Sequence, residues 1–137
     1  MEKIEIRILV CGGRDYGRRW NGTEWVEDVE QVNRLFKVLD KALAASRLTG
    51  KSFILIHGGA RGADRLSGEW AKERNVETIV FYADWDTHKK AAGPIRNQKM
   101  LTNGKPDAIV AFKGGNGTAH MIRIGRKANV PVYEVKE

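Results

Sequence analysis

The sequence predicts an α/β fold with a mostly parallel sheet, because short apolar runs alternate along it with segments of helical periodicity. Five of these runs are rich in β-branched and aliphatic side chains, as strands buried on both faces of a parallel sheet are. A glycine-rich or polar segment follows each run. The predicted strands cover residues 4–10, 53–56, 78–82, 108–112 and 130–135.

The first predicted helix begins near Thr23, which would act as its N-cap and is followed by Glu24, Glu27 and Asp28. Acidic side chains in a first turn interact favourably with the helix dipole. Residues 15–22, which precede this helix, are expected to form a mobile loop. Apolar residues then recur at spacings of three and four, the pattern of one buried helix face. They are Val29, Val32, Phe36, Leu39 and Leu43.

Three more helices are predicted between the later strands. The second covers residues 63–74, with Trp70 assigned to the core. The third begins at Pro94, because proline is tolerated at a first helical position, and ends before Asn103. The fourth follows Thr118 and carries basic residues in its last turn.

Right-handed crossovers make a doubly wound, Rossmann-like five-stranded sheet with helices on both faces the economical topology. The length is that of one domain, so we expect a single domain over residues 1–137. No apolar run has membrane-spanning length, and the first residues lack a secretory pattern, so we expect a soluble, cytoplasmic protein that does not bind membranes. Cys11 is the single cysteine and the histidines are isolated, which predicts no disulfide, no protein-held metal and no cofactor.

The formal net charge is +7, and it is distributed unevenly. Residues 87–133 contain nine Lys or Arg and one acidic residue, Asp107, a balance of +8, so the rest of the chain sums to −1. This basic segment predicts an anionic partner: a nucleotide, a nucleic acid or the acidic face of another protein. A solvated basic surface with no ligand is the alternative.

Three predicted strand-to-helix turns contain a Gly-Gly pair where the strand ends, at residues 11–15, 57–64 and 113–118. These turns meet at the carboxyl edge of a doubly wound sheet, where open α/β folds bind ligands. Glycine lets backbone N–H groups approach an anion, and the next helix adds its positive N-terminal end. Three such turns favour phosphate binding over a purely steric use of glycine. Their candidate ligand-binding residues are Gly12, Gly13, Arg14, Gly58, Gly59, Arg61, Asp64, Gly114, Gly115, Asn116, Gly117 and Thr118.

The turns lack both the Gly-Lys-Ser/Thr end of a Walker A motif and the G-x-G-x-x-G pattern, which argues against ATP hydrolysis and NAD-dependent hydride transfer. G-G-N-G-T at residues 114–118 resembles the P-G-G-x-G-T-x-x-E motif of the "lonely guy" phosphoribohydrolases. R-N-Q-K-M at residues 96–100 resembles the helix in which those enzymes place an Arg four residues before a Met. G-G-A-R-G-A-D at residues 58–64 is similar to the S-G-x-A-R-G-I-D turn of DNA-processing protein A.

Together with V-C-G-G-R-D-Y at residues 10–16 and G-P-I-R-N-Q at residues 93–98, these motifs make the chain resemble the YspA branch (YpsA-related) of the SLOG superfamily over almost its whole length. The resemblance implies that residues 114–118 surround a phosphate. It also implies that Arg96, with Asn97 beside it, reaches toward the same phosphate or the sugar.

Two positions depart from the motif of the hydrolases: Met121 stands at the acidic position, and Lys113 replaces the leading Pro. Cleavage of an N-glycosidic bond needs a carboxylate, by the same charge logic that governs glycoside hydrolysis. A hydrolase of this sequence would have to take it from Asp15, Asp64 or Glu69. The candidate catalytic residues are Arg96, Asp64 and Glu69.

Several side chains have a structural interpretation beside the functional one. Asp64 opens a helix and could act as its cap, and Arg61 could pair with Glu69 or Asp64 instead of a phosphate. Tyr16 is the preferred candidate to stack on a base, while Cys11 is expected to pack as a small hydrophobic residue. Three other aromatic residues could stack on a base, but core or interface anchors are the favoured interpretation: Trp20, Trp25 and Trp85.

Three functions follow from these observations. The leading one is binding of a nucleotide or nucleotide-derived small molecule by a sensor or sequestering protein. The second is a nucleoside-monophosphate N-glycosidase, and the third is a DNA-binding protein, against which stands the lack of a recognition helix or stacking platform. We also expect a homo-oligomer, because four Trp residues in a small domain favour self-association, with the helices after the third and fourth predicted strands near the contact.

Overall fold

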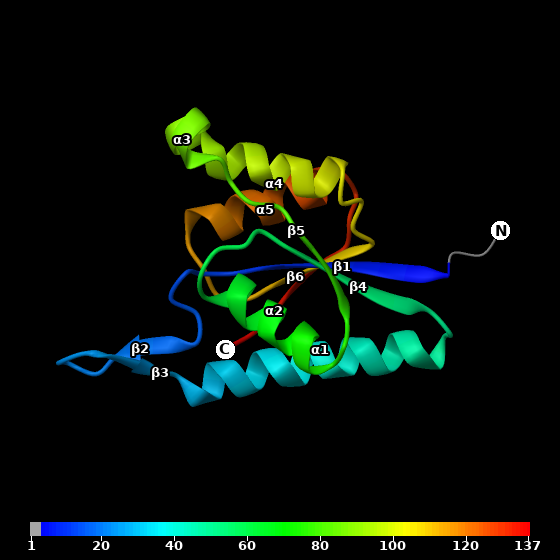
Figure 1. Cartoon of the computed structure of the whole chain (residues 1–137), viewed down its shortest axis with the longest axis horizontal. Coiled ribbons are helices and arrows are strands. Elements are labelled where there is room, and N and C mark those ends of the chain that lie inside the picture. Colours follow the sequence, from blue (N-terminus) through cyan, green and yellow to red (C-terminus); the bar gives the residue numbers. More distant parts are fainter. Residues whose placement is uncertain (1–3) are drawn as a thin grey trace.

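The computed structural model describes residues 4–137 and contains a five-stranded sheet in the order β5-β4-β1-β6-β7 (Figure 1). All four neighbouring pairs are parallel. The chain builds the sheet outward from β1 on one side and then returns to add strands on the other, so the strand order reverses between β1 and β6. The strands are β1 (Glu5–Cys11), β4 (Ser52–His57), β5 (Glu77–Val80), β6 (Ala108–Ala111) and β7 (Val132–Glu134).

Two helices cover each face of this sheet, which confirms the Rossmann-like α/β fold (Figure 1). One layer consists of α1 (Val29–Leu48) and α2 (Ala63–Glu73), and the other of α4 (Ala92–Thr102) and α5 (Asn116–Lys127). The short helix α3 (Trp85–His88) and a 3-10 turn at Lys89–Ala91 precede α4.

Strand β1 supplies side chains to both cores because successive residues of a strand point to opposite faces. Ile8 and Val10 pack against the α1–α2 layer, where Trp70 is fully buried as predicted. Leu9 and Cys11 pack on the other side with Met121 of α5. The sheet therefore separates two hydrophobic cores, and its strands are apolar on both faces.

The predicted start of the first helix at Thr23 is wrong. Helix α1 begins at Val29, and its N-cap is Asp28, whose side chain accepts a hydrogen bond of 3.1 Å from the N–H of Gln31. The expectation of a mobile loop over residues 15–22 is also incorrect, because part of that stretch forms a strand.

The residues before α1 form an antiparallel hairpin of β2 (Arg18–Trp20) and β3 (Trp25–Glu27), which projects beyond the sheet (Figure 1). Its turn is closed by Asn21, whose side-chain oxygen accepts from the N–H groups of Thr23 and Glu24. Trp20 and Trp25 face each other across the strands with ring centroids 5.9 Å apart. An Asn-Gly turn between aromatic residues favours such a hairpin over a helix start.

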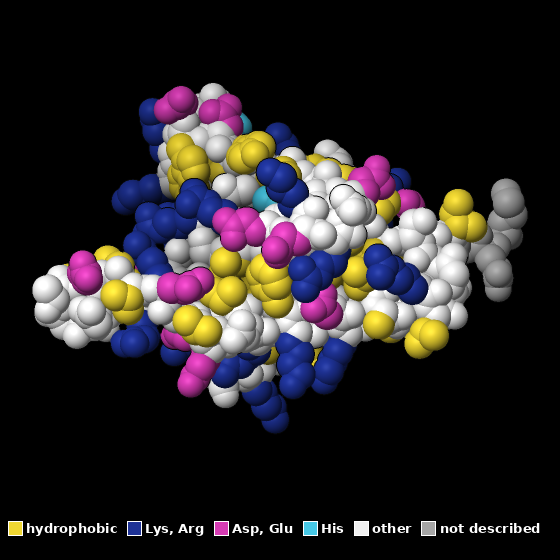
Figure 2. All heavy atoms as spheres, turned by 60° about the horizontal axis from the view of Figure 1, so that its bottom comes forward, with side chains coloured by type: hydrophobic (Ala, Val, Ile, Leu, Met, Phe, Trp, Pro, Cys, Tyr) yellow, Lys and Arg dark blue, Asp and Glu magenta, His cyan; other side chains and the backbone are white. Residues whose placement is uncertain are grey.

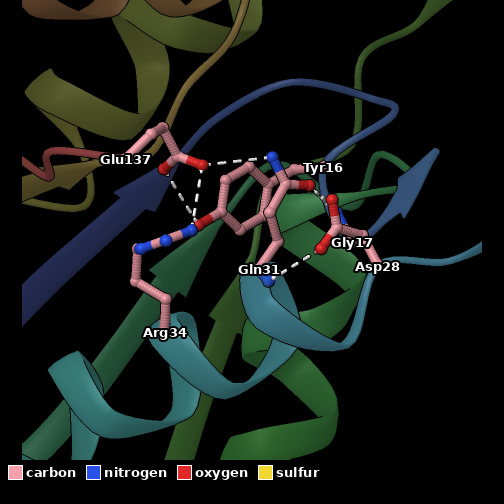
Figure 3. Close-up of polar contacts among 6 residues, drawn as sticks. All are labelled: Tyr16, Gly17, Asp28, Gln31, Arg34 and Glu137. Carbon is pink, nitrogen blue, oxygen red and sulfur yellow. Dashed lines mark hydrogen bonds and ion pairs between the residues drawn. The ribbon is translucent and has the colours of Figure 1, made fainter.

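A polar cluster anchors the base of this hairpin to α1 (Figure 3). The N–H of Asp28 donates to the carbonyl of Gly17 over 2.8 Å, and the N–H of Gly17 donates to the side chain of Gln31 over 2.8 Å. The Glu137 carboxylate accepts from Gln31 and from Arg34, each over 3.1 Å. The bond between Asp28 and Gly17 joins the two ends of the hairpin, and the bonds of Gln31 and Arg34 hold Gly17 and Glu137 against α1.

Tyr16 lies in the same cluster, and the expectation that it stacks on a ligand is not met. Its side chain is 4% exposed and packs on Phe112 with centroids 5.2 Å apart. Its hydroxyl donates to Glu137 over 3.2 Å, and burial raises its pKa to about 12 (Figure 3). Tyr16 is a structural residue that ties the turn after β1 to α1.

Helix α4 begins two residues before the predicted Pro94, at Ala92. Pro94 still lies in the first turn, where its missing N–H removes no hydrogen bond of the helix. None of the helices in the described part of the chain is long and apolar enough to cross a membrane.

Candidate ligand-binding site

A cavity of about 630 Å³ opens at the carboxyl ends of β1 and β6, where the strand order reverses. Open α/β sheets bind their ligands at this position. The structure brings most of the predicted site residues to its wall. These are Gly12, Gly13, Arg14, Asp64, Arg96, Asn97, Gly115, Asn116, Gly117 and Thr118.

The start of α5 is the part of the wall best suited to an anion. The N-cap of α5 is Gly115, whose φ is −105°, and α5 lacks a side-chain cap among the described residues. The first N–H groups of the helix therefore remain available, and the helix dipole makes this end positive. Apart from the adjacent residues and the helix's own backbone, no described atom lies within 4 Å of a Cβ built on Gly115 or Gly117, so neither glycine is needed for packing.

The glycines of the other two turns are explained by close packing. A Cβ on Gly12 would lie 2.6 Å from the Cβ of Ala63, where the turn after β1 crosses the start of α2. A Cβ on Gly58 would collide with the guanidinium of Arg96. Gly62 has φ of +84°, and a Cβ there would overlap the carbonyl of Gly13. The steric explanation of glycine applies to these turns.

The N–H groups of the turn after β4 are already used within the protein. Asp64 is 7% exposed, and its Oδ2 accepts from the N–H groups of Gly58 and Ala60 over 3.1 and 3.2 Å. The N–H of Gly59 donates to Nδ1 of His57 over 3.0 Å. In this structure Gly58 and Gly59 therefore shape the loop and do not direct amides toward the cavity.

Burial raises the pKa of Asp64 to about 6, although the N–H groups of Ala60 and Gly58 and the charge of Arg96 oppose the shift. Desolvation penalises the ionised carboxylate more than these contacts stabilise it. Asp64 thus places a carboxyl group that titrates near neutrality on the wall of a cationic cavity.

We expect Asp64→Asn to change the pH dependence of stability. A carboxyl whose pKa is raised in the folded state stabilises the fold below about pH 4, and this contribution is lost as the pH rises through about 6. The loss amounts to at most about 3 kcal/mol. Asn can accept the same two N–H groups and does not ionise. Urea unfolding between pH 4 and 7 should show the variant gaining stability relative to the native protein as the pH rises, and a constant difference would contradict the shift.

Arg96 is held in place by two hydrogen bonds. One guanidinium nitrogen donates to the carbonyl of Gly58 over 2.5 Å, and Nε donates to Oδ1 of Asn97 over 3.0 Å. Asn97 is 5% exposed and lies on α4 against the start of α5. Helix α4 thus fixes the direction of the arginine that the family resemblance places at the phosphate.

Four charged or aromatic residues of the wall are not among the predicted site residues: Trp85, Lys90, His120 and Arg123. Trp85 and Lys90 come from the α3 segment, for which no structure was predicted. His120 and Arg123 follow Asn116 at helical spacing on α5, a signal that could have been used. The Arg14 guanidinium lies 5.3 Å from the centroid of the Trp85 ring.

The charge of the wall is strongly positive. The cavity is lined by four cationic side chains, those of Arg14, Lys90, Arg96 and Arg123. Among the described residues, Asp64 supplies the one carboxyl group of the wall. Lys and Arg side chains also gather on the surface between α3 and the β2–β3 hairpin (Figure 2). A concave, low-dielectric site lined by positive charges attracts anions.

Five predicted site residues do not line this cavity: Gly58, Gly59, Arg61, Glu69 and Gly114. Glu69 lines a separate depression that it shares with His57 and Tyr82. A guanidinium nitrogen of Arg61 lies 3.6 Å from a carboxylate oxygen of Asp15. The expected ion pair of Arg61 with Glu69 or Asp64 is therefore wrong. Gly114 lines another depression with Arg18, and a Cβ on it would collide with the hydroxyl of Thr118.

Met121 and Cys11 give the cavity no reactive group. Met121 is 1% exposed and belongs to the core, so the position of the hydrolases' acid lies in the apolar interior. Cys11 is buried as predicted, and burial raises its pKa to about 12, which disfavours the nucleophilic thiolate. Among residues 4–137, His, Cys, Asp and Glu side chains form no cluster suited to a metal ion.

The reversed strand order defines a Rossmann-like α/β protein, and the cationic cavity at that reversal is its candidate site. The chain belongs to the YspA, cpYpsA-related SLOG family, whose model matches residues 6–88. This match confirms the resemblance drawn from the sequence motifs.

A curated relative extends the comparison beyond the matched segment. The chain is 41% identical over 133 residues to the Gene 61 protein of Mycobacterium phage D29, with 92% of this chain and 93% of the relative covered. The similarity therefore includes α4 and α5, which carry half of the cavity wall. The search of solved structures gave no significant match.

Proposed function

We propose that this protein binds a nucleotide or nucleotide-derived small molecule in the cavity at the switch point and acts as a sensor or sequestering protein. The observation that carries the proposal is the open start of α5. Gly115 and Gly117 have no packing role, and both line the cavity at the start of α5, where a side chain would enter open space. A phosphate that approaches the N–H groups closely explains both glycines.

The size and lining of the cavity support the same ligand class. A volume of about 630 Å³ lies within the range of small-molecule sites. Arg96 and Arg123 can neutralise a phosphate, while Trp85 offers an aromatic surface at the rim. Membership of the SLOG family agrees with a nucleotide-related ligand.

The proposal predicts that cavity arginines dominate binding. We expect Arg96→Ala and Arg123→Ala each to weaken binding of 5′-AMP about ten- to a hundredfold in calorimetry, because each removes a charge-assisted hydrogen bond. Arg123 is exposed on α5, so its loss should not disturb the fold. Lys136→Ala, an exposed cation away from the cavity wall, is the matched control. If all three variants bound equally well, the phosphate site would lie elsewhere.

Hydrolysis of an N-glycosidic bond is the second candidate function, and Asp64 is the observation that favours it. Its carboxyl lies on the cavity wall near Arg96 and titrates near neutrality, so it could replace the acid that Met121 displaces. Analysis of the calorimetry mixtures for free adenine separates the two functions, because hydrolysis of 5′-AMP releases adenine and binding alone does not. Release of base by the native protein and not by Asp64→Asn would establish an enzyme.

DNA binding and self-association stay predictions. The basic surface between α3 and the hairpin could contact nucleic acid, but the cationic residues of the wall surround a concave site (Figure 2). Trp20 and Trp25 of the hairpin are 55% and 46% exposed, which fits the expected contact between copies of the chain.

A further inference from the structure

Asn97 connects three parts of the cavity wall through its side-chain amide. Its Oδ1 accepts from Nε of Arg96 over 3.0 Å. Its Nδ2 lies 3.2 Å from the carbonyl oxygen of Gly117 and 3.1 Å from Nδ1 of His120. The side chain is buried between α4 and α5, so these contacts satisfy the amide where water has little access.

The orientation of this amide follows from its partners. Nε of Arg96 can only donate, so the atom facing it must be the oxygen of Asn97. The carbonyl of Gly117 can only accept, so the atom facing it must be the nitrogen. Two independent partners therefore assign the same orientation, and a flipped amide would lose both hydrogen bonds.

The protonation of His120 then follows from Asn97. Nδ2 of Asn97 carries hydrogens and no lone pair for a hydrogen bond, so Nδ1 of His120 must accept from it. A neutral imidazole that accepts at Nδ1 carries its proton on Nε2. An imidazolium would direct an Nδ1–H at the amide hydrogens. Burial and the nearby charge of Arg123 also lower the pKa of His120.

We propose that Asn97 is a positioning residue that holds His120 as the neutral Nε2–H tautomer, so that α5 presents an uncharged donor to the cavity one turn beyond its N-terminus. The proposal rests on the proposed function for the use of this donor, which is to bind an acceptor oxygen of the phosphate or sugar. His120 lines the cavity between the helix start and Arg123. It would therefore select a ligand by geometry without adding to the charge of the wall.

The tautomer can be measured without any ligand, by correlating imidazole nitrogens and ring protons in NMR spectra at neutral pH. We expect the Nε2–H pattern for His120, assigned by its loss in His120→Gln. In Asn97→Asp a carboxylate oxygen faces Nδ1, so the proton should move to Nδ1 or the ring should become charged. His57, whose Nδ1 accepts from the N–H of Gly59, is an internal control that should not change. An imidazolium or Nδ1–H form in the native protein would overturn the proposal.

The second part of the test measures binding of 5′-AMP to His120 variants by calorimetry. His120→Ala should weaken binding about tenfold, and His120→Gln, whose amide nitrogen lies near the position of Nε2, should recover most of that loss. His120→Asn places its amide near Nδ1 instead and should not recover it. If the native protein bound 5′-AMP and His120→Ala bound it equally well, the donor role would be wrong. Failure of the native protein to bind would count against the proposed function, while the NMR result would still decide the tautomer.

Discussion

Replacing Gly115 with valine should abolish ligand binding while leaving the fold intact. Gly115 has φ of −105°, which other residues adopt, and no described atom lies within 4 Å of the position of its Cβ. Gly115 lines the cavity, so the branched side chain would take up part of the open space at the start of α5. A phosphate excluded from the first N–H groups of α5 loses several hydrogen bonds at once, so we expect binding of 5′-AMP to fall at least a hundredfold.

Gly117→Ala is a second test of the same site, in which an effect on binding is separated from an effect on stability. Gly117 lies in the first turn of α5 and also faces open space. Alanine is the better helix former, so the variant should be as stable as the native protein or more stable by up to about 1 kcal/mol. Loss of binding together with unchanged or higher stability in urea unfolding would show that the glycine serves the ligand. Native affinity in both variants would remove the main support for the phosphate site.

Gly62→Ala should have the largest effect on stability, at about 3 kcal/mol or more. Gly62 has φ of +84° and ψ of −129°, a backbone conformation largely restricted to glycine that costs an L-residue about 1 to 3 kcal/mol. A Cβ there would also overlap the backbone of Gly13 and Arg14, where the turn after β1 crosses the start of α2. Rigid backbone atoms cannot move aside as a flexible side chain can, so the strain adds to the conformational cost.

Gly50→Ala separates these two contributions. Gly50 also has positive φ, +70°, but no described atom lies within 4 Å of the position that a Cβ would take there. This variant should lose only the conformational part, about 1 kcal/mol. Urea midpoints of the two variants give the difference directly. If Gly62→Ala and Gly50→Ala were equally destabilised, the backbone of Gly13 and Arg14 would move away from the new Cβ without a free-energy cost.

The sheet could be predicted from the sequence because its strands are buried on both faces and therefore appear as continuous apolar runs. The hairpin is harder to predict, because the acidic residues after Thr23 also fit a helix start and compete with the Asn21-Gly22 turn between two tryptophans. Local pattern alone could not decide between these possibilities, since Asp28 and Thr23 are both suitable caps.

The sequence predicts where the candidate site lies in the fold but not which glycines face the cavity. The three glycine pairs look alike in the sequence, yet Gly12 is required by Ala63 and Gly115 by no protein atom that the structure describes. That distinction depends on contacts between segments far apart in the chain. The same limit applies to His120, whose role depends on a hydrogen bond from Asn97 of another helix.

The hydrogen bond between Asp28 and Gly17 has a consequence for how this fold can vary. The chain enters and leaves the hairpin at two residues that are already joined, so the segment between them is an appendage whose length is independent of the sheet. Because the entropy of closing a loop grows slowly with its length, insertions and deletions here cost little. The hairpin is thus the place where the fold can acquire new surface without disturbing the body that holds the cavity.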